Sequence, residues 1–340
     1  MLDKALVLAA LLPALCALPA ALPAQEAATA ELRRVAIEEW PVPWEDSRPR
    51  DPDVAPDGSV WFVGQRGDYL ARLDPESGEF TKHDLESGTG PHNLVVDAGG
   101  RVWYAGNRAA HVGRFDPGSG EITKIPMPEP EAGGRDPHTL VADGRGHLWF
   151  TVQGGNSVGR LATESGEVRL IALPTERARP YGIVVSPAGR PWLTEFGANK
   201  LATVDPESLA LREIELPRDD ARPRRLALTS DGAVWYVDYA RGYLGRLDPE
   251  SGGIEEWPVP GGREARPYAM ASDDRDRLWF VESGGEPNRL VGFDPETEAF
   301  FAAGEVPSGG GTVRHMVFHE PTRTLWFGTD TNTIARAKVP

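Results

Sequence analysis

The chain has a single cysteine, Cys16, among its 340 residues. One cysteine cannot form an intramolecular disulfide, so the fold must be held together by its core alone. Cys16 also lies in an N-terminal segment that we expect to be removed. Thiol chemistry and cysteine-based zinc sites are therefore excluded for the rest of the chain.

The sequence has only one long apolar run, ALVLAALLPALCALPAALPA, which follows Lys4. The run is short and broken by prolines, which argues against a membrane span. Small residues close it, and we interpret residues 1–24 as a secretory signal peptide cleaved after Ala24. A lipoprotein signal on Cys16 is the rival interpretation, but Leu15 stands where a small residue is expected. We therefore expect an exported, periplasmic or secreted protein with a disordered lead at residues 25–34.

A basic excess is also missing, because 36 Lys and Arg face 51 Asp and Glu, which gives a formal charge of -15. Nucleic-acid binding depends on clustered basic residues, so we expect no such partner. A charged fraction of 26% and a mean hydropathy of -0.38 indicate a soluble globular protein. We expect a monomer without a membrane span.

One motif recurs seven times: a proline, a variable residue, an apolar alternation, an Asp/Gly turn and a tryptophan. In Asp136–Gln153 it reads DPHTLVADGRGHLWFTVQ. Twelve residues separate proline from tryptophan in six copies, whereas the copy at Val313–Trp326 has lost the proline and gained one residue. The tryptophans lie 42, 46, 43, 43, 44 and 47 residues apart, at Trp61, Trp103, Trp149, Trp192, Trp235, Trp279 and Trp326.

Periods of about 40–50 residues are typical of propeller blades and of helical repeats. Short alternating runs bounded by turn residues fill each period, and no amphipathic run of helical length is found. The sequence therefore predicts an all-β, seven-bladed propeller of four-stranded antiparallel blades over residues 35–340. We place the Pro-X segment at the start of the innermost strand and the tryptophan on the second strand.

The sequence IEEWPVP occurs at Ile37–Pro43, before the first copy, and again at Ile254–Pro260. The seventh copy has no outer strand of its own. We therefore expect the N-terminal segment to supply that strand and close the ring, which removes two sheet edges. The tryptophans are predicted to pack blade against blade, and the repeated DPESG segments are predicted turns.

The residue after each blade proline should face one mouth of the central channel. None of the seven is aliphatic: they are Arg50, His92, His138, Tyr181, Arg224, Tyr268 and Arg314. Because Arg offers a fixed fork of donors, one interpretation is a funnel that recognises an anion or carboxylate. The other is a wet channel in which the arginines pair with Glu195, Asp238, Glu282 and Asp330.

Blades two to four carry a compact set in this ring: His92, then Asp136 with His138, then Tyr181. Two imidazoles and a carboxylate on adjacent blades could provide a general base, a metal ligand and a positioning group. They could equally be hydrogen-bonding spacers. We assign no role to the three histidines His147, His315 and His319, which lie in turn-like or outer contexts.

Three segments of the repeats, RPYGI (Arg179–Ile183), LTEFGANKLATVDP (Leu193–Pro206) and LWFTVQGGNSVGRL (Leu148–Leu161), resemble the virginiamycin B lyase, or streptogramin lyase, family. The resemblance covers residues 35–340. It implies a seven-bladed propeller that opens an ester-closed ring by Mg²⁺-assisted elimination instead of hydrolysis. The family's site comprises a Pro-His, then Glu-Pro-His with a second Glu four residues past that blade's Trp, then Pro-Tyr-Gly-Ile.

By this resemblance, His138 would abstract the proton, while His92 and Tyr181 would contact the substrate. Asp136 would replace the first Glu as a Mg²⁺ ligand. Gln153 stands in place of the second Glu, and it brings an oxygen without a charge. The resemblance therefore predicts a carbon–oxygen lyase acting on a small ester-containing substrate, with Mg²⁺ as cofactor.

Two other functions stay open. A non-catalytic propeller could bind an anionic ligand at the Arg-rich mouth, with Arg50, Arg224, Tyr268 and Arg314 as ligand contacts. A lactonase-type hydrolase would need acidic metal ligands to converge in the channel, for which Glu195, Asp238 and Glu282 are available.

Overall fold

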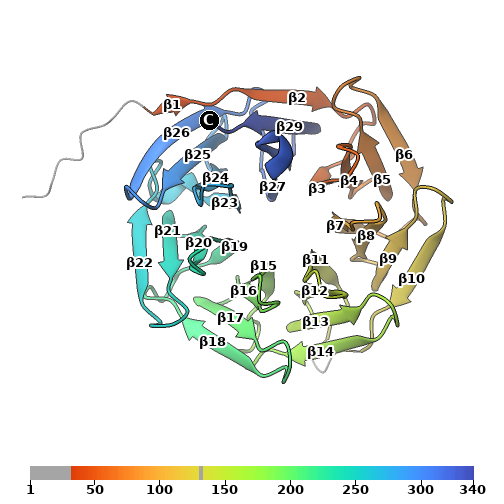
Figure 1. The fold of residues 1–340 in the computed structure, drawn as a ribbon, viewed down its shortest axis with the longest axis horizontal. Helices are drawn as coiled ribbons and strands as arrows, with labels where there is room; N and C mark the ends of the chain where they lie inside the picture. Colours follow the sequence, from red (N-terminus) through yellow and green to blue (C-terminus); the bar gives the residue numbers. More distant parts are fainter. Residues whose placement is uncertain (1–31, 130–132) are drawn as a thin grey trace, which may run out of the picture. The chain divides into compact units, whose positions relative to one another are not determined.

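The computed structural model describes residues 32–129 and 133–340, which form a ring of seven β-sheets around a central axis (Figure 1). Each sheet is one blade of at least four strands, so the predicted seven-bladed propeller is confirmed. The predicted signal peptide and residues 25–31 of the predicted lead lie outside the described residues. In the described part of the chain, no helix is long and apolar enough to cross a membrane.

The strands of a blade follow one another outward from the axis. The innermost strands are β3 (Pro49–Val54), β7 (Pro91–Val96), β11 (Pro137–Ala142), β15 (Pro180–Val185), β19 (Pro223–Leu228), β23 (Pro267–Ser272) and β27 (Met316–His319). The second strands are β4 (Val60–Gly64), β8 (Val102–Gly106), β12 (His147–Val152), β16 (Pro191–Glu195), β20 (Val234–Asp238), β24 (Leu278–Glu282) and β28 (Thr324–Gly328).

The third strands are β5 (Tyr69–Leu73), β9 (His111–Phe115), β13 (Ser157–Ala162), β17 (Lys200–Val204), β21 (Tyr243–Leu247), β25 (Arg289–Asp294) and β29 (Thr333–Lys338). The outermost strands are β6 (Phe80–Asp84), β10 (Ile122–Pro126), β14 (Val168–Ala172), β18 (Leu211–Glu215), β22 (Ile254–Pro258), β26 (Ala299–Glu305) and β2 (Ile37–Pro41). Two short 3₁₀ helices, η1 (Arg263–Ala265) and η2 (Glu320–Thr322), lie in the connecting loops.

The ring is closed by the N-terminal strand, as the repeated IEEWP segment predicted. Strand β2 pairs antiparallel with β29 in the seventh blade. A second copy of this five-residue sequence, IEEWP, forms β22, which is the outermost strand of the fifth blade. Even the tryptophan contact is repeated, because Trp40 stacks on Trp326 at 5.4 Å between ring centroids and Trp257 stacks on Trp235 at 5.5 Å.

The end of the predicted lead is ordered, which corrects the sequence-based boundary. Arg33 and Arg34 form strand β1, which runs parallel to β26 as a fifth strand of the sixth blade. The hydrogen bond from Val35 N to Ala303 O, 2.8 Å long, extends this pairing. The outermost strand of a sheet has unpaired backbone groups along its free edge. The backbone of β1 pairs with these groups of β26.

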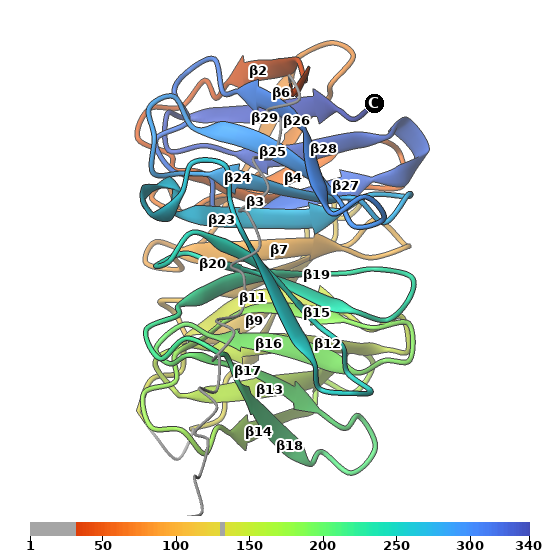
Figure 2. The same cartoon turned by 90° about the vertical axis from the view of Figure 1, so that its left-hand side faces the viewer.

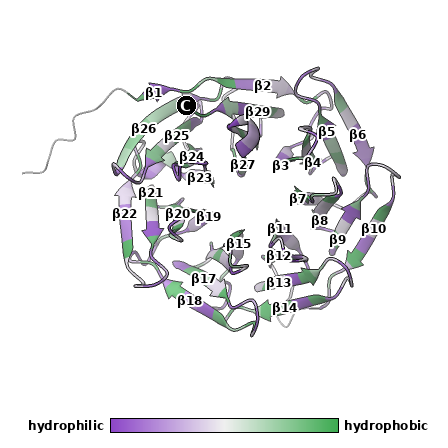
Figure 3. Ribbon diagram, in the orientation of Figure 1, coloured by the Kyte–Doolittle hydropathy of each residue, from purple (hydrophilic) through white to green (hydrophobic). Residues whose placement is uncertain are grey.

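The repeat tryptophans lie in the core, as predicted, and none of the seven is more than 3% exposed. Trp149 of the third blade packs against Leu193 and Ala202 of the fourth. Outer strands such as β18 and β22 contain both hydrophobic and hydrophilic residues, and their burial varies from residue to residue (Figure 3). The core therefore lies between neighbouring blades.

The innermost strands run along the ring axis, while outer strands such as β18 and β22 are inclined to it (Figure 2). This inclination is the ordinary twist of a β-sheet. Six innermost strands begin with the blade proline. The residues that follow these prolines are therefore brought to the same mouth of the channel.

Candidate functional site

A bulge follows the blade proline in all six innermost strands that begin with one. In β11, Pro137 pairs with Val152, and the next pair is Leu140 with Phe150, so one extra residue is inserted. A bulge changes the direction of the side chains next to it. Here it brings two consecutive residues of each blade, His138 and Thr139 in this case, into the polar network at the channel.

Five of the seven predicted channel residues are only 4–6% exposed: Arg50, His92, His138, Tyr181 and Tyr268. Arg50 Nη1 lies 2.8 Å from His92 Nε2, and His92 Nδ1 lies 3.1 Å from the carbonyl oxygen of His138. A carbonyl and a guanidinium are an acceptor and a donor, respectively, so His92 is neutral with its proton on Nδ1.

His138 lies between His92 and Tyr181. The ring centroids are 3.7 Å apart for His92 and His138 and 4.4 Å apart for His138 and Tyr181. His138 Nδ1 lies 2.9 Å from Thr139 Oγ1. Three of the four residues that the sequence grouped on adjacent blades, His92, His138 and Tyr181, are therefore in direct contact.

The tyrosines continue this chain of contacts across the channel. The hydroxyl of Tyr181 is hydrogen-bonded to that of Tyr268, and Arg224 Nη1 donates to the Tyr268 hydroxyl at 3.1 Å. Arg314, by contrast, pairs with Asp330 at the rim. The predicted ring is thus one network from Arg50 to Arg224, with Arg314 engaged separately.

A second layer of polar residues, which the sequence analysis missed, contacts the ring residues. It contains Asp51, Asn93, Thr139 and Arg225, each of which directly follows a ring residue in the sequence. Asp51 Oδ2 accepts from Asn93 Nδ2 at 3.1 Å and from Arg225 Nη2 at 3.2 Å. Arg225 Nη1 donates to Thr139 Oγ1 at 3.2 Å. Strict strand alternation would turn these residues away from the channel. The run of polar residues directly after the ring positions was the available signal.

His315 also belongs to this layer, which corrects its assignment to an outer context. It follows Arg314, and its Nδ1 is buried without a hydrogen-bond partner among the described residues. Burial and the nearby Arg225 lower the pKa of His315 to about 4. It is therefore neutral at physiological pH.

Burial and the positive charge of Arg50 also hold the pKa values of His92 and His138 well below the ordinary value. Burial opposes ionisation of Tyr181, but Arg50, Arg225 and Arg224 lower its pKa overall. Burial and the neighbouring Tyr181 raise the pKa of Tyr268. Both histidines are therefore neutral, and Tyr181 is the more acidic phenol of the pair.

The predicted pairing of channel arginines with four carboxylates holds only for Asp330, which contacts Arg48 and Arg314. Asp238 accepts backbone N–H groups, and Glu282 pairs with Arg289. Both carboxylate oxygens of Glu195 are buried without a hydrogen-bond partner among the described residues. The contacts of these four carboxylates are separate from one another, so the convergence that a lactonase-type metal site needs is not found among them.

Glu195 should make stability depend on pH. Burial and the neighbouring Glu213 raise its pKa from 4.5 to about 8, so between these values the folded state holds a proton that the unfolded state has lost. The free energy of unfolding should therefore fall as pH rises through this window. Relative to the wild type, Glu195→Gln should gain about 1.4 kcal/mol per pH unit. Urea unfolding at several pH values measures this, with exposed Glu207→Gln as the control, and parallel curves for Glu195→Gln and the wild type would contradict it.

Asp136 lies in the loop before β11, and both carboxylate oxygens accept from Gly154 N, at 2.8 and 2.9 Å. A Cβ on Gly134 or Gly154 would lie 2.9 Å from Asp136 Oδ1, so a larger residue at either position would displace this carboxylate. The adjacent Gln153 is half-buried and lines a cavity of about 640 Å³. The two predicted metal ligands thus lie at the same end of the third blade, Asp136 just before β11 and Gln153 just after β12.

No cluster of three or more His, Cys, Asp or Glu side chains suited to a metal occurs within residues 32–129 and 133–340. A metal at Asp136 would have one carboxylate, one amide oxygen from Gln153, and water. Such a set suits Mg²⁺, which is commonly held by one or two carboxylates and keeps several waters.

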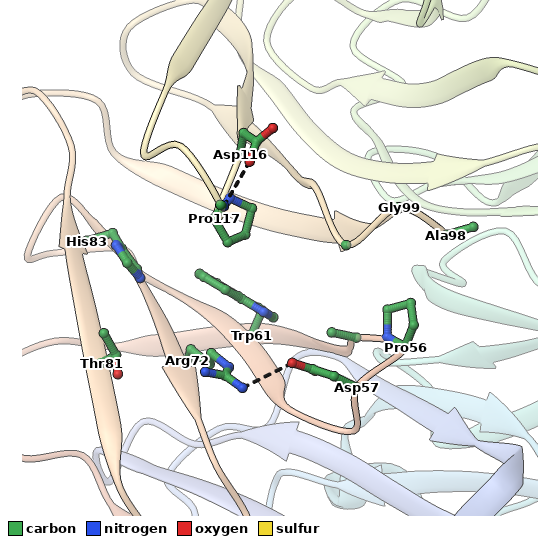
Figure 4. Close-up of a pocket in the computed structure, with 13 residues that line it drawn as sticks. Pro56, Asp57, Trp61, Arg72, Thr81, His83, Ala98, Gly99, Asp116 and Pro117 are labelled. Carbon is green, nitrogen blue, oxygen red and sulfur yellow. Dashed lines mark hydrogen bonds and ion pairs between the residues drawn. The ribbon is translucent and has the colours of Figure 1, made fainter.

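Two further cavities lie away from this mouth. One, of about 450 Å³, occupies the other half of the channel and is lined mainly by apolar residues such as Leu140, Ile183 and Met316. The other, of about 570 Å³, lies between the first two blades (Figure 4). There Arg72 pairs with Asp57 beside Trp61 and His83. Neither contains a residue of the predicted ring.

The chain is similar to known proteins both in sequence and in structure. The model of the virginiamycin B lyase family matches residues 35–337. A solved streptogramin B lyase structure is 24% identical and has a TM-score of 0.80, over 90% of this chain and 98% of that one. No curated protein sequence matches the chain.

Two structures of virginiamycin B lyase from Staphylococcus aureus are also similar. One is a selenomethionine form and the other a catalytically inactive His-to-Ala variant with quinupristin. Both are 24% identical to this chain with a TM-score of 0.79, over 90% of this chain and 100% of theirs. At this identity the solved structures establish a shared fold.

Proposed function

The chain belongs to the virginiamycin B lyase family, and on this premise we propose that it is a carbon–oxygen lyase that cleaves an ester by elimination. The observation that carries the proposal is the contact series His92–His138–Tyr181 on three adjacent blades. It gives a neutral imidazole between two groups that can position a substrate.

His138 is the proposed base. We assign to His138 the tautomer in which Nδ1–H donates to Thr139 Oγ1, so that Nε2 carries the free lone pair. Nε2 takes the proton from the carbon next to the one that bears the ester oxygen. That electron pair forms the C=C bond, the C–O bond breaks, and the carboxylate leaves. His92 and Tyr181 orient the substrate on either side of the base.

Mg²⁺, when bound at Asp136 and Gln153, would act as a Lewis acid on a carbonyl oxygen of the substrate. The Asp136 carboxylate is held in place by Gly154 N–H, which leaves other lone pairs free for an ion. We expect calorimetry to detect Mg²⁺ or Mn²⁺ binding to the wild type and its loss in Asp136→Asn. Binding that Asp136→Asn leaves unchanged would refute this site.

The activity is tested with ester-closed rings, for which quinupristin, found with a relative, is a starting probe. Opening a ring by elimination leaves the mass unchanged, whereas hydrolysis adds one water. We expect a product of unchanged mass with a new C=C bond. A hydrated product would refute the reaction class.

The second candidate is a non-catalytic propeller that binds an anionic ligand at the channel mouth. It is favoured by buried N–H groups of Arg50 and Arg224 that have no hydrogen-bond partner in the part of the chain that the structure describes. Saturable binding of an anion without turnover of any ester would support this alternative over the lyase.

We also propose that the protein is exported, which the apolar run within residues 1–24 supports. Expression of the full chain in a Gram-negative host, followed by fractionation and N-terminal sequencing, tests this. A cytoplasmic product that retains Met1 would contradict export.

A further inference from the structure

The polar network at the channel carries more positive than negative charge. Arg50 and Arg225 are 5% and 3% exposed, and Arg224 is half-buried above them. The carboxylate that contacts Arg50 and Arg225 is Asp51. With the histidines neutral, two guanidinium charges have no counter-ion in the network. Buried charges are costly unless they are paired.

The hydrogen bonding of these arginines is also incomplete. Arg50 donates from Nη1 to Gln65 and His92, but its Nε and Nη2 are buried without a hydrogen-bond partner among the described residues. Arg50 Nε is 3.5 Å from Asp51 Oδ1. Arg224 has a buried Nε in the same condition. Unsatisfied donors on buried cations call for an anionic acceptor.

Aromatic rings hold Arg224 in place. Its guanidinium carbon lies 3.4 Å from the ring centroid of Phe196 and 4.6 Å from those of Tyr239 and Tyr268. Contact with ring faces leaves the edge of a guanidinium for hydrogen bonding. The edge is the part that pairs with a carboxylate in a bidentate manner. Arg224 is therefore oriented in advance for a planar anion.

We propose that Arg50 and Arg224, beside the Tyr181–Tyr268 pair, bind a carboxylate, and that the substrate is a carboxylic acid with an oxygen leaving group β to that carboxylate. This rests on the proposed function and narrows it. The substrate of the proposed lyase and the anionic ligand of the second candidate function would then be the same molecule. The simplest members of the class are 3-acyloxy acids, in which the ester oxygen is the leaving group β to the carboxylate.

The chemistry gives the arginines a reason to be there. Removal of the proton α to a carboxylate places a second negative charge on the same group, so nearby cations lower the barrier. The Cα–H bond breaks, and its electrons form Cα=Cβ. The Cβ–O bond breaks, and its electrons leave with the oxygen. The proton moves to His138 Nε2.

Binding is measured without turnover in a His138→Ala background, with 3-acetoxybutyrate as the probe and its methyl ester as the uncharged match. We expect the acid to bind and the ester to bind at least about tenfold more weakly. Arg224→Gln should weaken binding of the acid by about tenfold or more and leave ester binding unchanged. Arg263→Gln, an equal charge change on an exposed loop of the same face, should have no effect.

Arg50 is buried, so Arg50→Lys accompanies Arg50→Gln and keeps the charge while removing the fork of donors. Both should weaken binding of the acid in protein whose thermal unfolding remains cooperative. Equal binding of acid and ester, or full binding of the acid to Arg224→Gln, would overturn the proposal.

The two proposals can fail separately. Elimination from neutral esters that Arg224→Gln does not impair would refute the carboxylate site and leave the lyase standing. Arginine-dependent binding of the acid, with no elimination by the wild type, would retain the site and refute the lyase.

Discussion

Replacement of Asp51 by alanine is expected to lower the free energy of unfolding by about 3–5 kcal/mol, the usual cost of removing one partner of a buried ion pair. Asp51 is 1% exposed and contacts Arg50, Arg225 and Asn93. Its loss leaves two buried guanidiniums without the carboxylate that they share. Urea unfolding of wild type and variant measures the difference.

The matched control is Asp57→Ala. Asp57 also pairs with an arginine, Arg72, at 3.0 Å, but its side chain is 58% exposed. An exposed pair contributes at most about 1 kcal/mol. Similar losses in the two variants would mean that burial does not decide the role of Asp51, which would contradict the expected result.

The contacts of Asp51 with Arg50 and Arg225 should also make the free energy of unfolding depend on pH. Burial raises the pKa of Asp51, but Arg50 and Arg225 lower it overall, below its value in the unfolded chain. The carboxylate therefore stabilises the fold fully above its unfolded pKa. This contribution is lost as pH falls through the folded pKa. Asp51→Ala should lose less stability than the wild type on acidification.

The second large effect is on activity: His138→Ala should lower kcat by about 10²–10⁴-fold, the usual contribution of a general base. His138 is neutral, lies between His92 and Tyr181, and has Nδ1 held by Thr139. Steady-state kinetics on an ester that the wild type turns over measures the loss.

His147→Ala is the control for this prediction. His147 is the first residue of β12 and pairs with Asp143 at 3.0 Å, at the end of the blade remote from His138. It should retain wild-type kcat. Full activity in His138→Ala would show that His138 is not the base. An equal loss of kcat in both variants would indicate damage to the fold.

The architecture could be predicted because each blade repeats the same short sequence patterns. Each tryptophan marks the second strand of a blade, and IEEWP has the same role in β2 and β22. The ring positions could be predicted for the same reason, since the proline fixes the start of the innermost strand. Local pattern therefore identified His92, His138 and Tyr181 as neighbours.

The second layer depends on contacts that no local pattern contains. Asp51 and Arg225 pair across 174 residues of sequence, and both reach the network through a bulge that breaks strand alternation. Phe196 and Tyr239, which enclose Arg224, follow the second strands of two different blades. Only the closed ring brings these residues together. Residue type alone identified a polar mouth, and geometry showed guanidinium N–H groups that lack a hydrogen-bond partner among the described residues.

We propose that this channel mouth breaks a carbon–oxygen bond by elimination. The most direct test is to run the reaction in water enriched in the heavy oxygen isotope and analyse the released carboxylate by mass spectrometry. Elimination transfers no oxygen from water, so we predict a carboxylate without the label and a product with a C=C bond. A labelled carboxylate would show that water attacks the ester carbonyl, and the enzyme would then be a hydrolase.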